Sequence, residues 1–207
     1  MMYPVKNVCF TWQDKTVNLL VPDEEEVRLI YNRDPSAAFP YWARLWPSAY
    51  ALSRFIVENN EYVAGKRVLE LAAGVGLPSM VAALSASEVC CSDYLPEAVE
   101  LMQRSTQLNR FNNVRCELLN WHHLPETTRA DVLLLSDINY DPAEFEVLYG
   151  VLAKFLNNGT PILLTTPQRL MARPFIAKLL PLCTRNEELV IQQDGSEDVR
   201  ISCLVLQ

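Results

Sequence analysis

An acidic residue and two glycines follow a short apolar run in the stretch from Lys66 to Gly76, KRVLELAAGVG. Glu70 ends the apolar run, and Gly74 and Gly76 permit positive φ and a close approach of the backbone to a ligand. Pro78 suits the first turn of a helix, because its missing N–H is not needed there. The order of strand, small-residue turn and helix is that of the nucleotide-binding entry of an open α/β sheet. The stretch therefore predicts a site for a nucleotide or nucleoside.

The dinucleotide fingerprint G-x-G-x-x-G does not fit this stretch, because three glycines at that spacing are absent. Small residues instead follow an acid at every second position: Glu70, Ala72, Gly74 and Gly76. Here the chain resembles the seven-stranded S-adenosylmethionine-dependent methyltransferases, whose first motif reads acidic-x-Gly-x-Gly-x-Gly. Ala72 replaces the first glycine, which leaves room for a cofactor but removes one position that can adopt positive φ. Two glycines in such a unit can also serve packing alone.

Polar and aromatic residues stand at the other predicted strand ends, where ligands bind in an open α/β sheet. Asp93 ends a second strand and can accept both ribose hydroxyls of a nucleoside, or it can cap the helix that follows. Trp121 ends a third strand, expected over residues 114–121, and can cover an adenine ring or close the core. Ser136 and Asp137 end a fourth strand that is nearly all apolar, and Tyr140 comes three residues later.

Two further motifs narrow the resemblance. Residues 41–52, YWARLWPSAYAL, are similar to the tryptophan-rich segment that precedes the first motif in the methyltransferase-like protein-lysine methyltransferases, and residues 136–141, SDINYD, contain their D-x-x-Y motif. The resemblance implies catalytic roles for Asp137 and Tyr140. It implies these cofactor-binding residues: Trp46, Glu70, Ala72, Ala73, Gly74, Gly76, Asp93, Trp121 and Ser136. Asn139 replaces the usual aliphatic residue before the tyrosine, so we expect a more polar pocket there.

The implied reaction moves a methyl group from a sulfonium carbon to an amine lone pair, without a metal or a covalent intermediate. Orientation and dehydration of the reactants can then supply ~7–11 kcal/mol. A lysine amine must be neutral to attack. An aromatic slot containing Trp42 and Tyr140 is expected to lower the amine pKa and to tolerate methylated cations through cation–π contact. Asp137 is expected to orient the ammonium group and relay its proton. Trp42 and Trp46 can instead form a buried cluster that holds the following helix.

The remaining reactive side chains predict little chemistry. Arg169 follows a fifth predicted strand near the pocket mouth and is a candidate substrate contact. His122 and His123 predict no metal site, because adjacent residues rarely face one ion and no third ligand is in view. The six cysteines include no C-x-x-C pair, so neither a zinc site nor a disulfide framework is expected. They are typical of small buried hydrophobic residues in a reducing compartment.

Composition excludes several classes of protein. The 207 residues carry a net charge of −7 and no basic stripe, which argues against nucleic-acid binding and is compatible with basic partners. Half of the residues are hydrophobic, yet no run approaches the ~20 apolar residues that span a bilayer. The first ten residues lack the apolar segment of a secretory signal. We therefore expect a cytoplasmic protein without a membrane partner, and nothing in the pattern indicates its oligomeric state.

The chain divides into an extension and one larger domain. Residues 5–21 predict a hairpin, a helix is expected from Pro22-Asp23 and a loop over 33–40, and a second helix begins at about Ser48. Five strand-and-helix units and a terminal hairpin around Asp194-Gly195 then follow. The methyltransferase family shares this plan. We therefore expect a doubly wound, Rossmann-like α/β fold over 41–207, with a mostly parallel seven-stranded sheet and an antiparallel C-terminal hairpin, preceded by a lid or platform over 1–40.

Together these features predict an S-adenosylmethionine-dependent N-methyltransferase that acts on a lysine of a protein. The first alternative is an enzyme of the same fold that methylates a small amine or a ring nitrogen, because fold does not settle substrate. The second alternative is a non-catalytic module that keeps the cofactor pocket for stability or for recognition of a partner.

Overall fold

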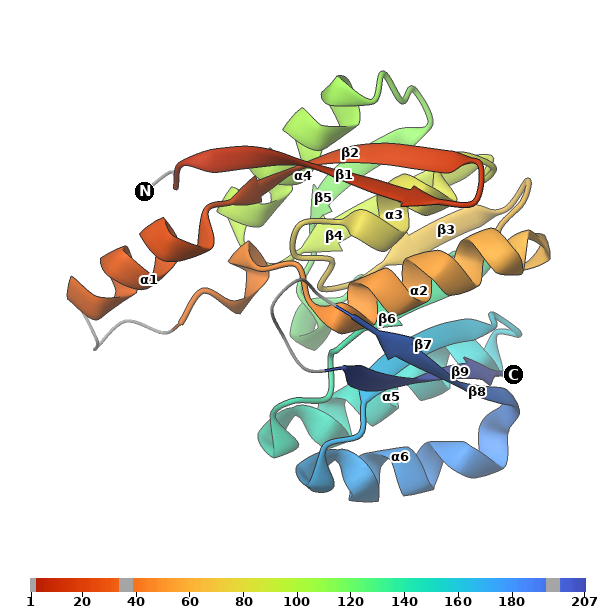
Figure 1. Ribbon diagram of the computed structural model, residues 1–207. Coiled ribbons are helices and arrows are strands. Elements are labelled where there is room, and N and C mark those ends of the chain that lie inside the picture. The colour runs from red at the N-terminus through yellow and green to blue at the C-terminus, as the bar shows by residue number, and fades with distance from the viewer. Residues whose placement is uncertain (1–2, 34–38, 193–197) are drawn as a thin grey trace.

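The computed structural model describes residues 3–33, 39–192 and 198–207, and its centre is a seven-stranded sheet (Figure 1). The strands are β3 (Arg67–Glu70), β4 (Glu88–Asp93), β5 (Val114–Leu118), β6 (Val132–Ser136), β7 (Ile162–Pro167), β8 (Cys183–Ile191) and β9 (Val199–Leu206). Their order is β5-β4-β3-β6-β7-β9-β8. The strands from β5 to β7 are parallel, and β9 pairs antiparallel with β7 and β8. The predicted fold class is confirmed.

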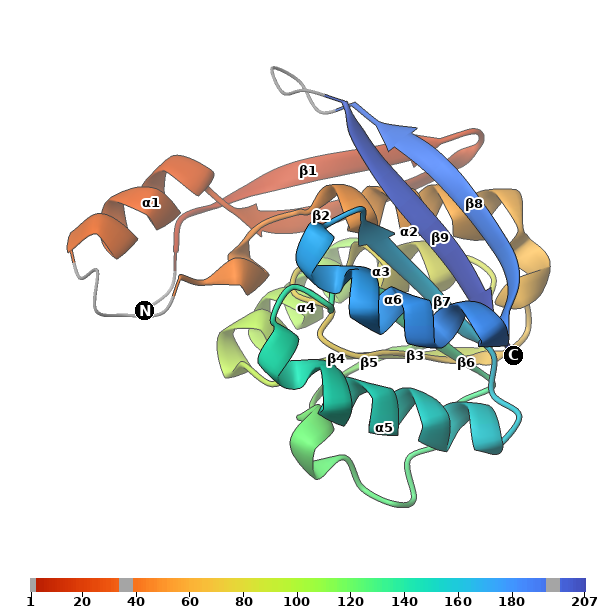
Figure 2. The same ribbon diagram turned by 90° about the horizontal axis from the view of Figure 1, so that it is seen from below.

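Helices cover both faces of this sheet (Figure 2). The helices are α2 (Pro47–Glu58), α3 (Leu77–Ala82) and α4 (Pro96–Leu108) on one face, and α5 (Phe145–Asn157) and α6 (Arg173–Leu179) on the other. In β6, Val132 and Leu134 pack toward α2 and α3, whereas Leu133 and Leu135 pack toward α5 and α6. A strand buried on both faces must be apolar throughout, which explains the continuous apolar run of β6.

Helix starts follow simple local rules. Proline occupies the first turn of α2, α3, α4 and α6, where the missing N–H costs no hydrogen bond. Helix α1 (Glu24–Arg33) begins after Asp23, whose Oδ1 accepts from the N–H groups of Glu25 and Glu26 at 3.0 and 3.3 Å. Three glutamates in its first turn also suit the positive end of the helix dipole. The helix predicted after Pro22-Asp23 is thus present.

The N-terminal hairpin packs against the helical layer. Strands β1 (Val5–Trp12) and β2 (Lys15–Pro22) pair antiparallel, and the side-chain amide of Asn109 in the turn after α4 bonds both the N–H and the C=O of Asn18. Phe10, Val17 and Leu19 belong to the same buried cluster as α2 and α3. In Figure 1 the hairpin lies across α3 and α4. The N-terminal hairpin is therefore joined to the main core by apolar packing.

The structure moves some predicted boundaries. The third predicted strand, expected to run to Trp121, ends at Leu118, because Asn120 caps a 3-10 turn over Trp121–His123 by accepting from His122 N at 2.9 Å. The first strand of the last hairpin, expected from Glu187, begins at Cys183. Much of the predicted loop over 33–40 and the predicted Asp194-Gly195 turn lie outside the described residues. Within the described ranges, none of the helices has the length and apolar character needed to cross a bilayer.

Candidate active site

A cavity of about 380 Å³ opens at the carboxyl ends of β3, β4 and β6, beside the segment that leads into α2. It brings together most of the residues predicted from the sequence. Those that line it are Trp42, Trp46, Ala72, Ala73, Gly74, Asp93, Trp121, Ser136, Asp137, Tyr140 and Arg169. The location agrees with the rule that open α/β sheets bind ligands at the carboxyl ends of their strands.

The turn after β3 adopts an unusual backbone conformation. Ala72, Gly74 and Gly76 have φ of 51°, 56° and 80°, so the alanine takes the conformation that its family position normally gives to glycine. The expectation that the alanine at position 72 removes a positive φ is thus wrong. A left-handed alanine costs ~1–2 kcal/mol, and the turn supplies compensation, because Ala73 N donates to Ser92 O at 2.9 Å. The strained turn exposes main chain to the cavity.

Asp93 is a buried carboxylate that accepts a hydrogen bond from this turn. Its side chain is 3% exposed, and its two oxygens accept from the N–H groups of Gly74 and Leu95 at 3.0 and 3.1 Å. Burial raises the pKa of Asp93 above its usual range, although the backbone N–H bonds act in the other direction. The N-cap of α4 is Leu95, so Asp93 is not the cap that the sequence also allowed. The free lone pairs of its oxygens are suited to the two hydroxyls of a ribose.

Two predicted cofactor contacts lie beneath the turn instead of in the cavity. Glu70 is fully buried, and its Oε2 accepts from Ser79 N and Oγ at 2.9 and 2.6 Å. Burial raises the pKa of Glu70 to about 8. A Cβ on Gly76 would meet Cys91 Sγ at 2.9 Å, so this glycine allows tight packing. Both positions therefore support the turn from the core side, because their strand-end location did not determine which way they face.

The indole of Trp121 stands between the cavity and a second hollow. Trp121 lines the cavity, and its Nε1 donates to Glu144 Oε2 at 2.9 Å. His122 Nε2 lies 2.8 Å from the same oxygen. A second hollow of about 310 Å³ continues past Trp121, Tyr94 and Tyr140. Glu144 and Tyr94 were not predicted as site residues; Tyr94 could have been found as the neighbour of Asp93 at a strand end.

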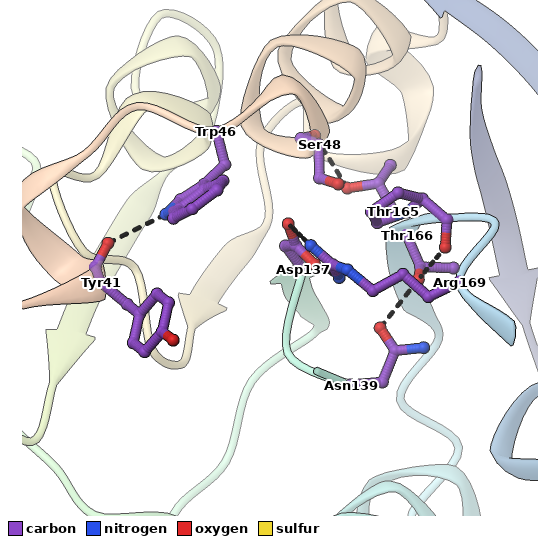
Figure 3. A network of polar contacts seen from close by, with 9 residues as sticks. Tyr41, Trp46, Ser48, Asp137, Asn139, Thr165, Thr166 and Arg169 are labelled. Carbon is purple, nitrogen blue, oxygen red and sulfur yellow. Dashed lines mark hydrogen bonds and ion pairs between the residues drawn. The ribbon is translucent and has the colours of Figure 1, made fainter. Parts of the chain in front are cut away.

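Aromatic side chains line the cavity beside the segment that leads into α2 (Figure 3). Trp46 Nε1 donates to Tyr41 O at 2.9 Å, and the Tyr41 ring lies 5.5 Å from the Tyr140 ring. Trp42 packs against Tyr3 with a centroid distance of 6.0 Å. Burial raises the pKa of the Tyr140 hydroxyl. Tyr41 and Tyr3 were not predicted as site residues, although Tyr41 stands at the start of the tryptophan-rich segment.

Asp137 and Arg169 form an ion pair in the cavity. Arg169 Nη2 donates to Asp137 Oδ2 at 2.9 Å, and Nη1 contacts Oδ1. Asp137 was expected to orient the substrate, and Arg169 was expected to touch it; the structure joins them to each other. Asn139 is fully buried, accepts from Thr166 Oγ1 at 2.8 Å and does not line the cavity. The expectation of a more polar pocket at Asn139 is therefore wrong.

A family model described as lysine methyltransferase matches residues 26–180. The chain belongs to this family. This membership confirms the family that the motifs indicated, whose cofactor is S-adenosylmethionine. The chemistry of the cavity lining fits such a cofactor: Asp93 is a buried acid that can accept from hydroxyls, Gly74 presents main chain, and Trp121 presents an indole on which an aromatic ring can stack.

Two curated relatives match parts of the chain. The electron transfer flavoprotein beta subunit lysine methyltransferase of Danio rerio is 36% identical over 63% of this chain and 51% of its own length. The human histone-arginine methyltransferase METTL23 is 32% identical over 56% of this chain and 64% of its own length. The matched region thus spans about half to under two thirds of these relatives.

Solved structures show the same fold at low identity. The N-methyltransferase NodS from Bradyrhizobium japonicum WM9, solved with S-adenosyl-L-homocysteine, superposes with a TM-score of 0.63 and 14% identity, over 87% of this chain and 98% of that chain. TrmN from Thermus thermophilus superposes with a TM-score of 0.59 and 22% identity, over 86% of this chain and 53% of that one. These likenesses concern the fold alone.

Metal chemistry finds no support in the described part of the chain. Residues 3–33, 39–192 and 198–207 contain no group of three or more His, Cys, Asp or Glu side chains placed to hold an ion. His122 and His123 lie with ring centroids 6.4 Å apart, and His122 is directed to Glu144. All six cysteines have free thiols.

Proposed function

We propose that the protein is an S-adenosylmethionine-dependent N-methyltransferase that methylates a lysine side chain of a protein. One observation carries the proposal: a single cavity joins a turn and acid suited to a nucleoside, Gly74 and Asp93, to an aromatic corner that contains Asp137 and Tyr140. When bound, S-adenosylmethionine supplies an electrophilic methyl group. The chain's own residues need only orient an amine toward it and exclude water.

Each half of the cavity has a separate task in this proposal. Asp93 would hold the ribose hydroxyls, and the backbone at Ala73 and Gly74 would lie against the amino acid part of the cofactor. Trp42, Tyr140 and the neighbouring Tyr41 would enclose the acceptor side chain in a slot of low polarity that favours the neutral amine. The same rings can bind a methylated ammonium product by cation–π contact.

Protein acceptors are favoured by the relatives and by the shape of the site. The relatives are named for methylation of a flavoprotein subunit and of histones, and the rim of the cavity exposes Tyr41 and Tyr140 by 51% and 42%. Because METTL23 is named for arginine, an arginine acceptor is the second candidate, and a small amine remains the third. The net charge of −7 favours a basic protein over a nucleic acid as the partner. The free cysteines are consistent with the cytoplasm.

Radiolabelled methyl transfer tests the proposal. The purified protein is incubated with methyl-labelled S-adenosylmethionine and three acceptor samples: a cytoplasmic lysate, electron transfer flavoprotein beta subunit, and core histones. We expect label in a protein band, and acid hydrolysis of that band should yield methylated lysine. An Asp137→Asn variant, treated identically, should leave the band unlabelled. Label only in small molecules would support the third candidate, and methylarginine in the hydrolysate would support the second.

A further inference from the structure

The ion pair between Asp137 and Arg169 joins two segments that lie 32 residues apart in the sequence. The Asp137 side chain is 8% exposed and the Arg169 side chain 30%, so the pair is largely shielded from water. Two parallel N–H···O contacts fix the plane of the carboxylate as well as its position. Figure 3 shows the guanidinium lying directly against the carboxylate.

The surrounding backbone holds Asp137 in this orientation. Asp137 has a φ of 56°, a strained conformation for a residue with a side chain, and its N–H donates to Thr165 O at 2.9 Å. The bond from Thr166 Oγ1 to Asn139 ties the next part of the loop to the same strand, β7, and Arg169 follows that strand. Two contacts from β7 thus hold the loop that carries Asp137, and Arg169 lies just after that strand.

A carboxylate beside an acceptor amine has an unwanted effect on methyl transfer. It favours the charged ammonium form, raising the amine pKa, whereas a nearby cation favours the neutral form. Only the neutral amine has the lone pair that attacks the methyl carbon. An unpaired Asp137 would therefore hold the acceptor in its unreactive state.

We propose that Arg169 is a positioning residue that neutralises Asp137, so that the pocket takes the acceptor amine in its uncharged form. The proposal rests on the N-methyltransferase function argued above, and it assigns Arg169 to Asp137 instead of to the substrate. Asp137 keeps one lone pair on each oxygen for an N–H of the bound amine. The carboxylate can then orient the amine without favouring its protonation.

The other charged or titratable groups around the cavity come from several elements. They are Tyr3, Tyr41, Arg44, Asp93, Tyr94, Glu97 and Tyr140. Asp93 has backbone N–H partners on both oxygens, and Arg44 Nε lies 3.3 Å from Glu24 Oε1. These groups are the same in every variant at position 169, so a changed pH dependence between variants reports on Arg169.

The test uses n-butylamine as a mimic of the lysine side chain. Its binding is titrated by calorimetry between pH 6 and pH 9, with and without S-adenosylhomocysteine, to wild type, Arg169→Met and Arg169→Lys. Wild-type affinity should rise with pH as the uncharged amine becomes more abundant. Arg169→Met should bind at least ~10-fold more tightly than wild type at pH 6, since a free carboxylate favours the charged amine by 1–3 pKa units. Arg169→Lys should follow wild type.

A double variant, Arg169→Met with Asp137→Asn, isolates the role of Asp137. It should lose the gain in affinity at pH 6, because no carboxylate remains to hold the ammonium ion. If Arg169→Met does not fold, Arg169→Gln removes the charge but keeps an N–H donor toward Asp137 and gives the same readout. The proposal is overturned by identical pH dependence in wild type and Arg169→Met, by an equal gain at every pH, or by no binding to wild type. The S-adenosylhomocysteine titration of the same samples tests the underlying function separately.

Discussion

The two halves of the cavity are built in different ways. The cofactor half, formed by the turn Ala72–Gly76 and by Asp93, is held by backbone N–H groups that donate to a carboxylate or a carbonyl. The acceptor half, formed by Tyr41–Trp46, Asp137–Tyr140 and Arg169, is held largely by contacts of side chains from three separate segments. The first half is therefore set by local chain geometry, and the second by the assembled fold.

The halves also differ in how far they are exposed. Asp93 is 3% exposed, whereas Tyr41 and Tyr140 are 51% and 42% exposed at the rim. A buried, prearranged half binds its ligand with little reorganisation, while an open aromatic rim can admit part of a larger partner. Cofactor affinity and turnover should therefore respond to different substitutions.

The largest effect is expected in the acceptor half. Asp137→Asn should lower the single-turnover rate of methylation by at least ~100-fold, because the oriented carboxylate acts on the acceptor in the transition state. S-adenosylmethionine affinity should stay within about twofold, since Asp93 and the turn remain intact. Tyr140→Phe, which keeps the ring, is the matched comparison and measures the part that the hydroxyl plays. Equal losses of rate and cofactor affinity in Asp137→Asn would erase the distinction between the halves.

The next effect is expected in the cofactor half. A Cβ on Gly74 would lie 3.1 Å from Trp42 O at a φ of 56°, so Gly74→Val must displace the turn that faces the cofactor. Cofactor affinity should fall by ~2–3 kcal/mol, on the order of 100-fold. Gly159→Val is the control, because Gly159 has a φ of 74° and nothing within 4 Å of its added Cβ. Normal cofactor binding by a folded Gly74→Val protein would refute the placement of the turn.

A third prediction concerns stability beneath the cofactor half. The folded-state pKa of Glu70, about 8, lies above the usual value of 4.5, so the unfolded chain loses this proton at lower pH than the folded chain. The contribution of Glu70 to stability should therefore be greatest below about pH 4.5 and fall as pH rises toward 8, by up to ~1.4 kcal/mol per pH unit. Glu70→Gln keeps an acceptor for Ser79 but cannot ionise, so its stability should fall less.

Urea unfolding at pH 5, 6.5 and 8 measures this difference. The free energy of unfolding of Glu70→Gln, relative to that of wild type, should increase by ~2 kcal/mol or more between pH 5 and pH 8. The contribution of Glu70 to stability changes most over this range. Glu61→Gln, the same change at an exposed position, is the control for effects of composition. A constant difference between wild type and Glu70→Gln at all three pH values would show that burial does not perturb Glu70.

The position of the turn and of Asp93 at the cavity could be predicted from the sequence because the determinants of that position are local. The alternation of small residues after β3 and the apolar runs of the strands fix where each strand ends, and strand ends meet at one edge of the sheet. The direction in which each strand-end side chain faces was harder to predict. Glu70 and Asp93 both end strands, yet Glu70 faces α3 and Asp93 faces the cavity. The periodicity of apolar residues predicts which side chains are buried. It does not distinguish a buried residue that contacts a ligand from one that stabilises the turn from the core.

For the acceptor half, the sequence indicated which residues lie near the pocket but not how they contact one another. Asp137, Tyr140 and Arg169 were all expected near the pocket, but the pairing of Asp137 with Arg169 depends on how the loops after β6 and β7 fold over one another. Asn139 looked like a pocket residue from its place before Tyr140, yet it turns toward Thr166 in the core. Such choices depend on tertiary packing, which no local pattern encodes.

The smallest predicted effect provides the most direct test of the central claim, that Asp93 and the turn form a cofactor site separate from the acceptor corner. S-adenosylmethionine is titrated by calorimetry into wild type, Asp93→Ala and Asp137→Asn. We expect one saturable site in wild type, affinity weakened by at least ~1.5 kcal/mol in Asp93→Ala, the scale of a charge-assisted hydrogen bond, and little change in Asp137→Asn. No binding to wild type, or an unchanged affinity in a folded Asp93→Ala protein, would contradict the account.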